Sequence, residues 1–176
     1  MSKTMRKMLS DWNAPYLQAL VKLIETQSKA TLANWAIDYA GCVLLPIWNK
    51  FDSNDLRPQN ALDSASAWLS GTIKLPQAKP VILACHEAAR AAESNPAAQA
   101  AARAIGQSAS TIHSATHCIG LPLYGALAAA YDALGTEVSW AQLEQYAAEE
   151  CGRMLDALNA AAVKNEPNPA KINWKC

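Results

Sequence analysis

Charged side chains are scarce in this sequence. Asp, Glu, Lys and Arg together make up 17% of the 176 residues, fifteen acids balance fifteen bases, and 51% of the residues are hydrophobic. Disordered chains combine few apolar residues with a high net charge, so this chain is not of that class. A net charge of zero also gives no general attraction to nucleic acid. We therefore expect one folded domain, residues 1–176, with a sizeable core and no nucleic-acid partner.

Long hydrophobic runs are missing as well. The first ten residues, MSKTMRKMLS, carry positive charge, but no apolar run of about 7–15 residues follows, so we expect no signal peptide here. No stretch approaches the roughly 20 apolar residues of a membrane span. We therefore expect a cytoplasmic protein without a membrane partner.

Cysteines are few and widely spaced, and no C-x-x-C pair occurs. An odd number of scattered cysteines in a cytoplasmic protein favours reduced, mostly buried thiols over disulfides. The residue at the end of the chain is the one we expect to be exposed. The five are Cys42, Cys85, Cys118, Cys151 and Cys176.

Strand-like alternation, internal repeats and glycine-rich phosphate loops are absent, whereas helix signals are frequent. Much of the apolar content is alanine, which favours helices and lets them approach closely. The predicted fold is all-α, a single-domain antiparallel bundle of about seven helices. Prolines, glycines and cap residues place these helices at 11–29, 31–50, 58–70, 76–93, 96–117, 122–134 and 139–163.

Particular residues mark where the predicted helices bend and end. The helix at 31–50 is apolar nearly all round, which predicts a central position in the bundle. Pro46 is expected to kink this helix or to end its regular part near Leu45. In the C-terminal tail, Trp174 is expected to fold back onto the body. Further signals are the C-terminal stops Gly71 and Gly135 and the capping box of Ser139 with Gln142.

The sequence is organised around residues 81–117, which contain all three histidines. Asn95 and Pro96 suit the cap and the first position of the second helix in this stretch. On that helix the isoleucines at 105, 112 and 119 share one face. The nearly opposite face has neither Lys nor Glu, so we expect another helix or a partner to cover it at least partly. It carries Arg103, Gln107, Ser110, His113, Ser114 and His117, and the preceding helix carries His86, Arg90 and Glu93 on one side.

Asp38 lies on the side of the second predicted helix that also carries Trp35 and Leu45. A carboxylate among apolar residues must pair with a cation or take up a proton. The alternative is an acid at the helix end that reaches water. The candidate partners are Arg57, Arg90 and Arg103.

His113 and His117, four residues apart, could ligate a metal together with His86 or Glu87. However, H-x-x-x-H is common by chance, and no thiol spacing supports a metal site. Serines near these histidines lie on the same predicted helix, which implies neither a strained nucleophile elbow nor an oxyanion hole. We therefore predict no catalytic residue, no metal and no cofactor, and favour a polar network between helices, or a binding surface, for the histidines and arginines.

The region from 132 to 156 is locally acidic, with Arg153 as its one base. A solvated helix face is one interpretation, and an acidic patch that meets a basic partner is the other. The acids are Asp132, Glu137, Glu144, Glu149, Glu150 and Asp156.

The runs DYAGCVL, DLRP, AWLSG, HEAAR and AAARAIGQSASTIHSATH, in this order, resemble the immunity proteins of bacterial polymorphic toxin systems, of the immunity-protein-five-like type. The resemblance covers about 38–134 and leaves out the C-terminal helix (139–163) and the tail (164–176). It implies an all-helical protein that binds and neutralises a toxin without being an enzyme. One departure is Gln107, where the family usually has a histidine. The matching polar positions are Asp38, Arg57, Pro58, His86, Arg90, Arg103, His113 and His117.

Two hypotheses follow. The first is an immunity protein whose partner is the cognate toxin. The second is a small helical enzyme or a ligand- or metal-binding protein that uses the central His/Arg groove, where Arg90 and Arg103 would clamp a carboxylate or phosphate. The sequence does not identify the toxin or the oligomeric state.

Overall fold

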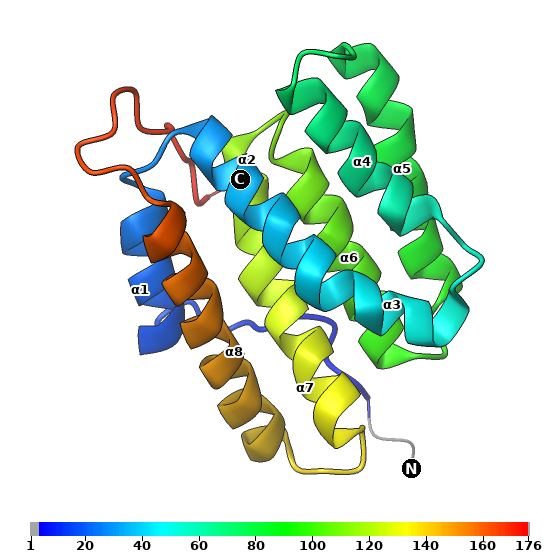
Figure 1. Cartoon of the computed structure of the whole chain (residues 1–176). Helices are drawn as coiled ribbons and strands as arrows, with labels where there is room; N and C mark the ends of the chain where they lie inside the picture. Colours follow the sequence, from blue (N-terminus) through cyan, green and yellow to red (C-terminus); the bar gives the residue numbers. More distant parts are fainter. Residues whose placement is uncertain (1–3, 176) are drawn as a thin grey trace.

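The computed structural model describes residues 4–175, and it confirms the all-α prediction, with no strand in this part of the chain. Three short elements interrupt or join the helices: the π turns η1 (Ala40–Leu44) and η3 (Leu121–Gly125), and the 3₁₀ helix η2 (Ala115–Ile119). The α-helices are α1 (Pro15–Ile24), α2 (Lys29–Tyr39), α3 (Leu45–Asp52), α4 (Arg57–Leu69), α5 (Leu75–Ala91), α6 (Pro96–Ser110), α7 (Ala126–Leu134) and α8 (Trp140–Ala161) (Figure 1).

The central helix is α6, not the predicted helix at 31–50. It contacts α2, α3, α4, α5 and α7, and ten of its fifteen residues are buried, six of them alanines. The α2–α3 stretch crosses one side of the bundle (Figure 1) and keeps an open face with Asn34, Asp38 and Cys42 exposed. Alanine explains the difference, because its short side chain lets five neighbouring helices approach one axis.

The stretch from Lys29 to Asp52 is continuously helical, with η1 placed just before Pro46. Proline lacks an N–H and clashes with the carbonyl four residues earlier, and a π turn accommodates both effects. The predicted end of the regular helix before Pro46 is therefore confirmed. By length and composition this 24-residue stretch could cross a membrane, so the expectation that no segment approaches a span is wrong. In the bundle it packs against α6, α4 and α8.

The second helix of the central stretch is shorter than predicted, because α6 ends at Ser110 instead of continuing to residue 117. Ser110 Oγ donates to the Gly106 carbonyl at 2.8 Å, and Thr111 Oγ1 donates to the Gln107 carbonyl at 3.3 Å. Such side-chain bonds compete with the helical ladder where the helix ends. Although the helix stops, the isoleucines at 105, 112 and 119 are all buried, as predicted.

The predicted stops and caps are confirmed. Gly71 and Gly135 follow α4 and α7 with φ values of +76° and +72°. These values are unfavourable for residues that have a Cβ, which explains glycine at both positions. Ser139 and Gln142 form the expected capping box before α8. Trp174 anchors the tail, since its Nε1 donates to Glu25 Oε1 at 2.7 Å and its ring lies 6.0 Å from that of Trp12.

The thiols of Cys85, Cys118 and Cys151 are buried and free, as predicted, while that of Cys42 is exposed. Cys176, which was expected to be the exposed one, lies outside the described residues.

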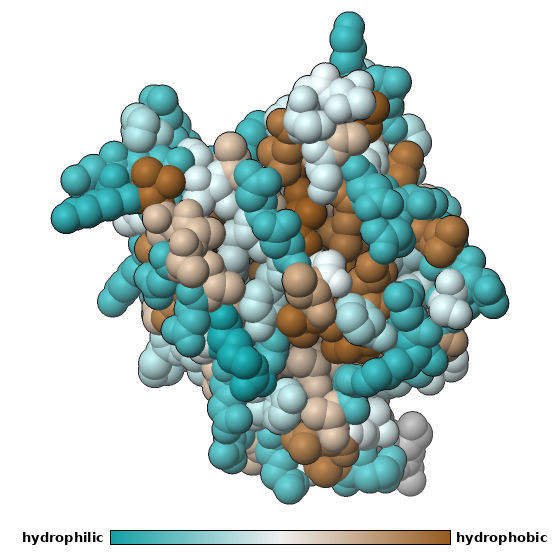
Figure 2. Space-filling view, in the orientation of Figure 1, coloured by the Kyte–Doolittle hydropathy of each residue, from teal (hydrophilic) through white to brown (hydrophobic). Residues whose placement is uncertain are grey.

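Polar residues cover most of the face shown in Figure 2, and hydrophobic residues reach the surface between α2 and α4.

Candidate functional site

All three histidines line one groove with a volume of about 230 Å³, here called the histidine groove. α5 supplies His86, the turn after α6 supplies His113, and η2 supplies His117. Because α6 ends at Ser110, the chain folds back and brings His117 toward α5. The other lining residues are Leu75, Lys79, Ile82, Leu83 and Ser110.

His86 lies where α5 and α6 approach each other closely. A Cβ on Gly106 would lie 2.6 Å from His86 Cε1, so the imidazole occupies the space that a side chain at 106 would need. Glycine inside a helix costs about 1 kcal/mol relative to alanine. The fold accepts this cost where the His86 ring packs directly against the backbone of α6.

His117 is oriented by Gln107, whose Oε1 lies 2.8 Å from the imidazole Nδ1. An amide oxygen only accepts hydrogen bonds, so Nδ1 carries the hydrogen and Nε2 of the neutral ring presents its lone pair. The stem of Gln107 lies against Gly120, where a Cβ would be 2.3 Å from Gln107 Cβ. Gln107 therefore fixes one ring of the histidine groove.

The imidazoles of His113 and His117 lie close together, with ring centroids 5.6 Å apart and planes inclined by 37°. They are not on one α-helix, because α6 ends before His113, so the expectation that both lie on one helical face is wrong. Among residues 4–175, no group of three or more His, Cys, Asp or Glu side chains is placed to hold a metal ion. The absence of a metal or cofactor in the working protein stays a prediction.

The environment of the groove keeps two imidazoles neutral. Burial lowers the pKa of His86, and the nearby charges of Arg103, His117 and Arg90 lower it further. Burial, together with His113, lowers the pKa of His117. At neutral pH both rings are therefore uncharged and can offer an N–H or a lone pair.

This protein should lose stability as the pH falls below about 6.5, the ordinary histidine pKa. The unfolded chain binds protons on both imidazoles there, whereas folded His86 and His117 resist them until the pH reaches their lowered pKa values. Their contribution to stability is therefore complete at pH values above the pKa of the unfolded chain. It is lost as the pH falls through the lower pKa values of the folded protein. Urea unfolding from pH 7.5 to 5.0 should show this loss, and it should be smaller in His86→Gln. An equal loss in that variant would contradict the assignment to His86.

The predicted polar network is brought together only in part. The groove unites His86, His113 and His117, and Gln107 adjoins it through its hydrogen bond to His117. Arg103 is half-buried beside His86 without an ion pair or hydrogen bond inside the described range. The other half-buried members of the polar row on α6 support the expectation that this face is partly covered, although His113 itself is exposed. Arg90 is also exposed and lies 3.9 Å from Glu87.

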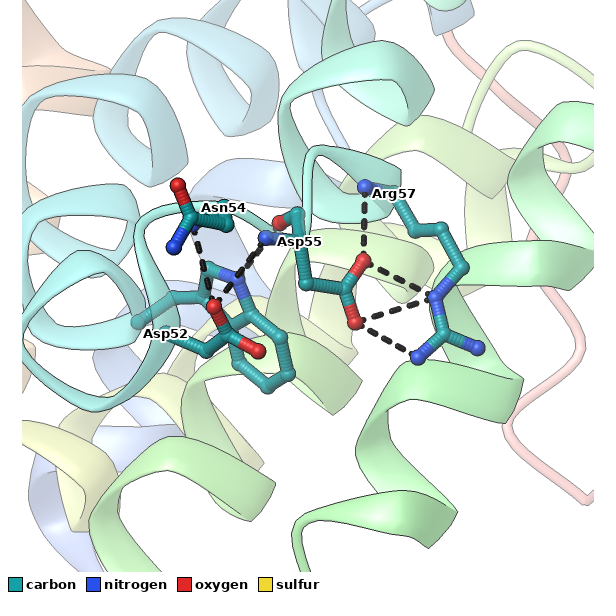
Figure 3. Close-up of polar contacts among 5 residues, drawn as sticks. Asp52, Asn54, Asp55 and Arg57 are labelled. Carbon is teal, nitrogen blue, oxygen red and sulfur yellow. Dashed lines mark hydrogen bonds and ion pairs between the residues drawn. The ribbon is translucent and has the colours of Figure 1, made fainter.

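Asp38 and Arg57 are not part of this network. Asp38 is exposed, so the prediction that it pairs with an arginine is wrong, and the alternative of an acid reaching water holds. Arg57 instead pairs with Asp55, whose carboxylate accepts from Nε at 2.9 and 3.0 Å (Figure 3). These hydrogen bonds lower the pKa of the Asp55 carboxyl. Asp52 caps the same loop by accepting from the backbone N–H of Asn54 at 3.0 Å.

The wall of the histidine groove that α5 forms was not predicted from the sequence. The signal that could have predicted it is the helical spacing of four residues on one side of α5, Leu75, Lys79, Ile82 and His86.

A second cavity of about 590 Å³ lies on the other side of His117, between the N-terminal segment, η2, η3 and the tail. Its aromatic lining residues are Trp12, Tyr124 and Trp174.

Much of the acidic region at 132–156 is used inside the protein. Glu150 is 4% exposed, accepts from the Tyr39 hydroxyl at 2.5 Å, and pairs with Arg153 at 2.6 Å. Burial and the hydrogen bond to Glu150 raise the pKa of the Tyr39 hydroxyl, which therefore stays a donor. Asp132 pairs with Lys50 at 2.6 Å. Asp132 is nevertheless exposed, and the exposed acids of this region without an ion pair among the described residues are Glu137, Glu149 and Asp156.

Comparison with known proteins gives one family. The model of the Imm-5 like putative immunity proteins matches residues 22–157, a range that extends past both ends of the stretch recognised in the sequence. No curated protein and no solved structure gives a significant match. The matched range includes the histidine groove and every helix from α2 to α7. The chain therefore belongs to the family of Imm-5 like putative immunity proteins.

Proposed function

We propose that this protein binds a bacterial toxin and neutralises it as a non-enzymatic immunity protein. The observation that carries the proposal is the family match over residues 22–157, which covers most of the chain. Such a protein works by covering part of the toxin, and a stable interface of this kind buries about 1,600 Å² in total. A helical bundle with a buried alanine-rich centre supplies the rigid surface that this requires.

The proposal is tested by co-expression with the product of the neighbouring gene, the candidate toxin. The toxin is placed under an inducible promoter, with the immunity protein on a second plasmid, and growth is followed after induction. We expect the chain to restore growth and to co-elute with an inactive toxin variant in size-exclusion chromatography. An empty plasmid and a toxin from an unrelated system are the controls. Failure to restore growth, together with failure to co-elute, would refute the proposal.

The second hypothesis, a ligand-binding or catalytic His/Arg groove, has weaker support. The histidine groove has a volume of about 230 Å³, below the range of about 300–1,000 Å³ typical of small-molecule sites. Arg90, one half of the supposed clamp, lies at the surface beside Glu87. A space of this size suits one side chain of a protein partner better than a whole ligand.

A further inference from the structure

The rim of the histidine groove carries an exposed leucine. Leu83 is 61% exposed, the largest exposed fraction among the large hydrophobic side chains that lie at the surface of residues 4–175. It lies in the middle of α5, and Leu75 and Ile82 continue the apolar lining toward the groove. Single exposed leucines are common on protein surfaces, but this one adjoins a lined depression.

The same rim carries one cation without a counter-ion, and a second lies close to it. Lys79 lines the groove and Arg103 lies beside His86, and within the described residues neither makes an ion pair or a hydrogen bond. The lining of the groove contains no carboxylate. The nearby acid Glu87 is not part of the lining and lies 3.9 Å from Arg90. A partner that placed a carboxylate here would find the free ammonium of Lys79, with the guanidinium of Arg103 next to His86.

The groove is also held in shape before any partner arrives. Gly106 allows the His86 ring to lie on α6, and Gly120 allows Gln107 to reach His117. A surface that is fixed before binding improves affinity because less conformational freedom is lost when the partner docks.

We propose that the histidine groove is the toxin-binding surface, and that it accepts an acidic side chain of the toxin whose apolar neighbour packs on Leu83. This inference rests on the proposed function and names the surface that performs it. The groove volume fits one side chain, so the rest of the interface would spread over the exposed side of α5. Charge complementarity and one central apolar anchor are the features that give protein interfaces their specificity and affinity.

The test measures the affinity of purified inactive toxin for the wild-type chain and four surface variants. The groove variants are Leu83→Asp and Lys79→Glu. The matched controls are Leu56→Asp, which replaces a leucine 56% exposed at the start of α4, and Lys22→Glu on α1. We expect Leu83→Asp to weaken binding by at least about 30-fold, as at an interface hot spot, and Lys79→Glu by about tenfold. The controls should stay within about threefold, and circular dichroism should show wild-type folding for all variants.

The outcomes separate the inference from the proposed function. If the wild-type chain binds the toxin and the groove variants bind as tightly as the controls, this surface is not the interface, while the immunity function stands. If the wild-type chain does not bind, the proposed function itself fails. Thermal shifts with inorganic phosphate and with Zn²⁺ complete the design. Stabilisation by either probe, combined with unchanged toxin affinity in Leu83→Asp, would overturn the docking site in favour of a small anion or metal site.

Discussion

Replacing Trp48 with alanine should lower the free energy of unfolding by about 3–5 kcal/mol. Trp48 is 1% exposed, and its neighbours in a small core cluster are the alanines at 88, 89, 92, 98 and 102 on and next to α5 and α6. Methyl groups fixed on helices cannot move into the space that the indole leaves, so the cavity would persist. Urea or guanidinium unfolding at neutral pH measures the loss.

Two companion variants test the origin of this effect. Trp48 Nε1 donates to the Asp55 carbonyl at 2.9 Å, and Trp48→Phe removes this bond while keeping an aromatic ring, so we expect it to cost less than alanine. Phe51, whose ring lies 5.5 Å from that of Trp48, is 39% exposed, and Phe51→Ala should cost less still. A loss below about 1.5 kcal/mol for Trp48→Ala would mean that the helices around it close the gap.

The helix boundaries that local chemistry decides could be predicted from the sequence. Pro96, Gly71 and the pair Ser139 and Gln142 act through their own φ values or hydrogen bonds, and all mark the boundaries as expected. The end of α6 at Ser110 could not be predicted in this way. The hydroxyls of Ser110 and Thr111 donate to backbone carbonyls that would accept from backbone N–H groups if the helix continued. The central position of α6 depends on which helices pack around it. The hydrophobic periodicity of α6 alone does not identify these neighbours.

The candidate site could be predicted as a set of residues but not as a shape. The scarcity of Lys and Glu around 103–117 correctly indicated a partly covered polar row. The groove wall from Leu75 to Leu83 depends on how α5 packs against the turn after α6, so only the structure identifies it. Asp38 was misplaced for a related reason, since it shares an exposed line with Asn34 and Cys42, the last of these inside the π turn.

Gly120→Ala should destabilise the protein by about 1–3 kcal/mol, although alanine is the better helix former. The backbone of Gly120 has ordinary helical angles, φ −62° and ψ −26°, so the effect is purely steric. A Cβ would lie 2.3 Å from Gln107 Cβ and 2.5 Å from its Cγ. These atoms are next to the backbone of α6 and cannot swing away, so η2 or α6 must shift. Chemical denaturation measures the loss, and the histidine NMR signals should show a disturbed His117.

Gly152→Ala is the matched control for this prediction. Gly152 lies inside α8, and a Cβ there would meet no atom within 4 Å, so alanine should stabilise the protein by up to about 1 kcal/mol. The two substitutions are chemically identical and should have opposite signs, because only one meets a neighbour. Gly106→Ala should fall between them, since the clashing atoms belong to the outer end of the His86 ring, which can rotate. If Gly120→Ala stabilised the protein as Gly152→Ala does, Gln107 would not be packed against Gly120. The fixed orientation of His117, and with it the preformed groove, would then have no structural basis.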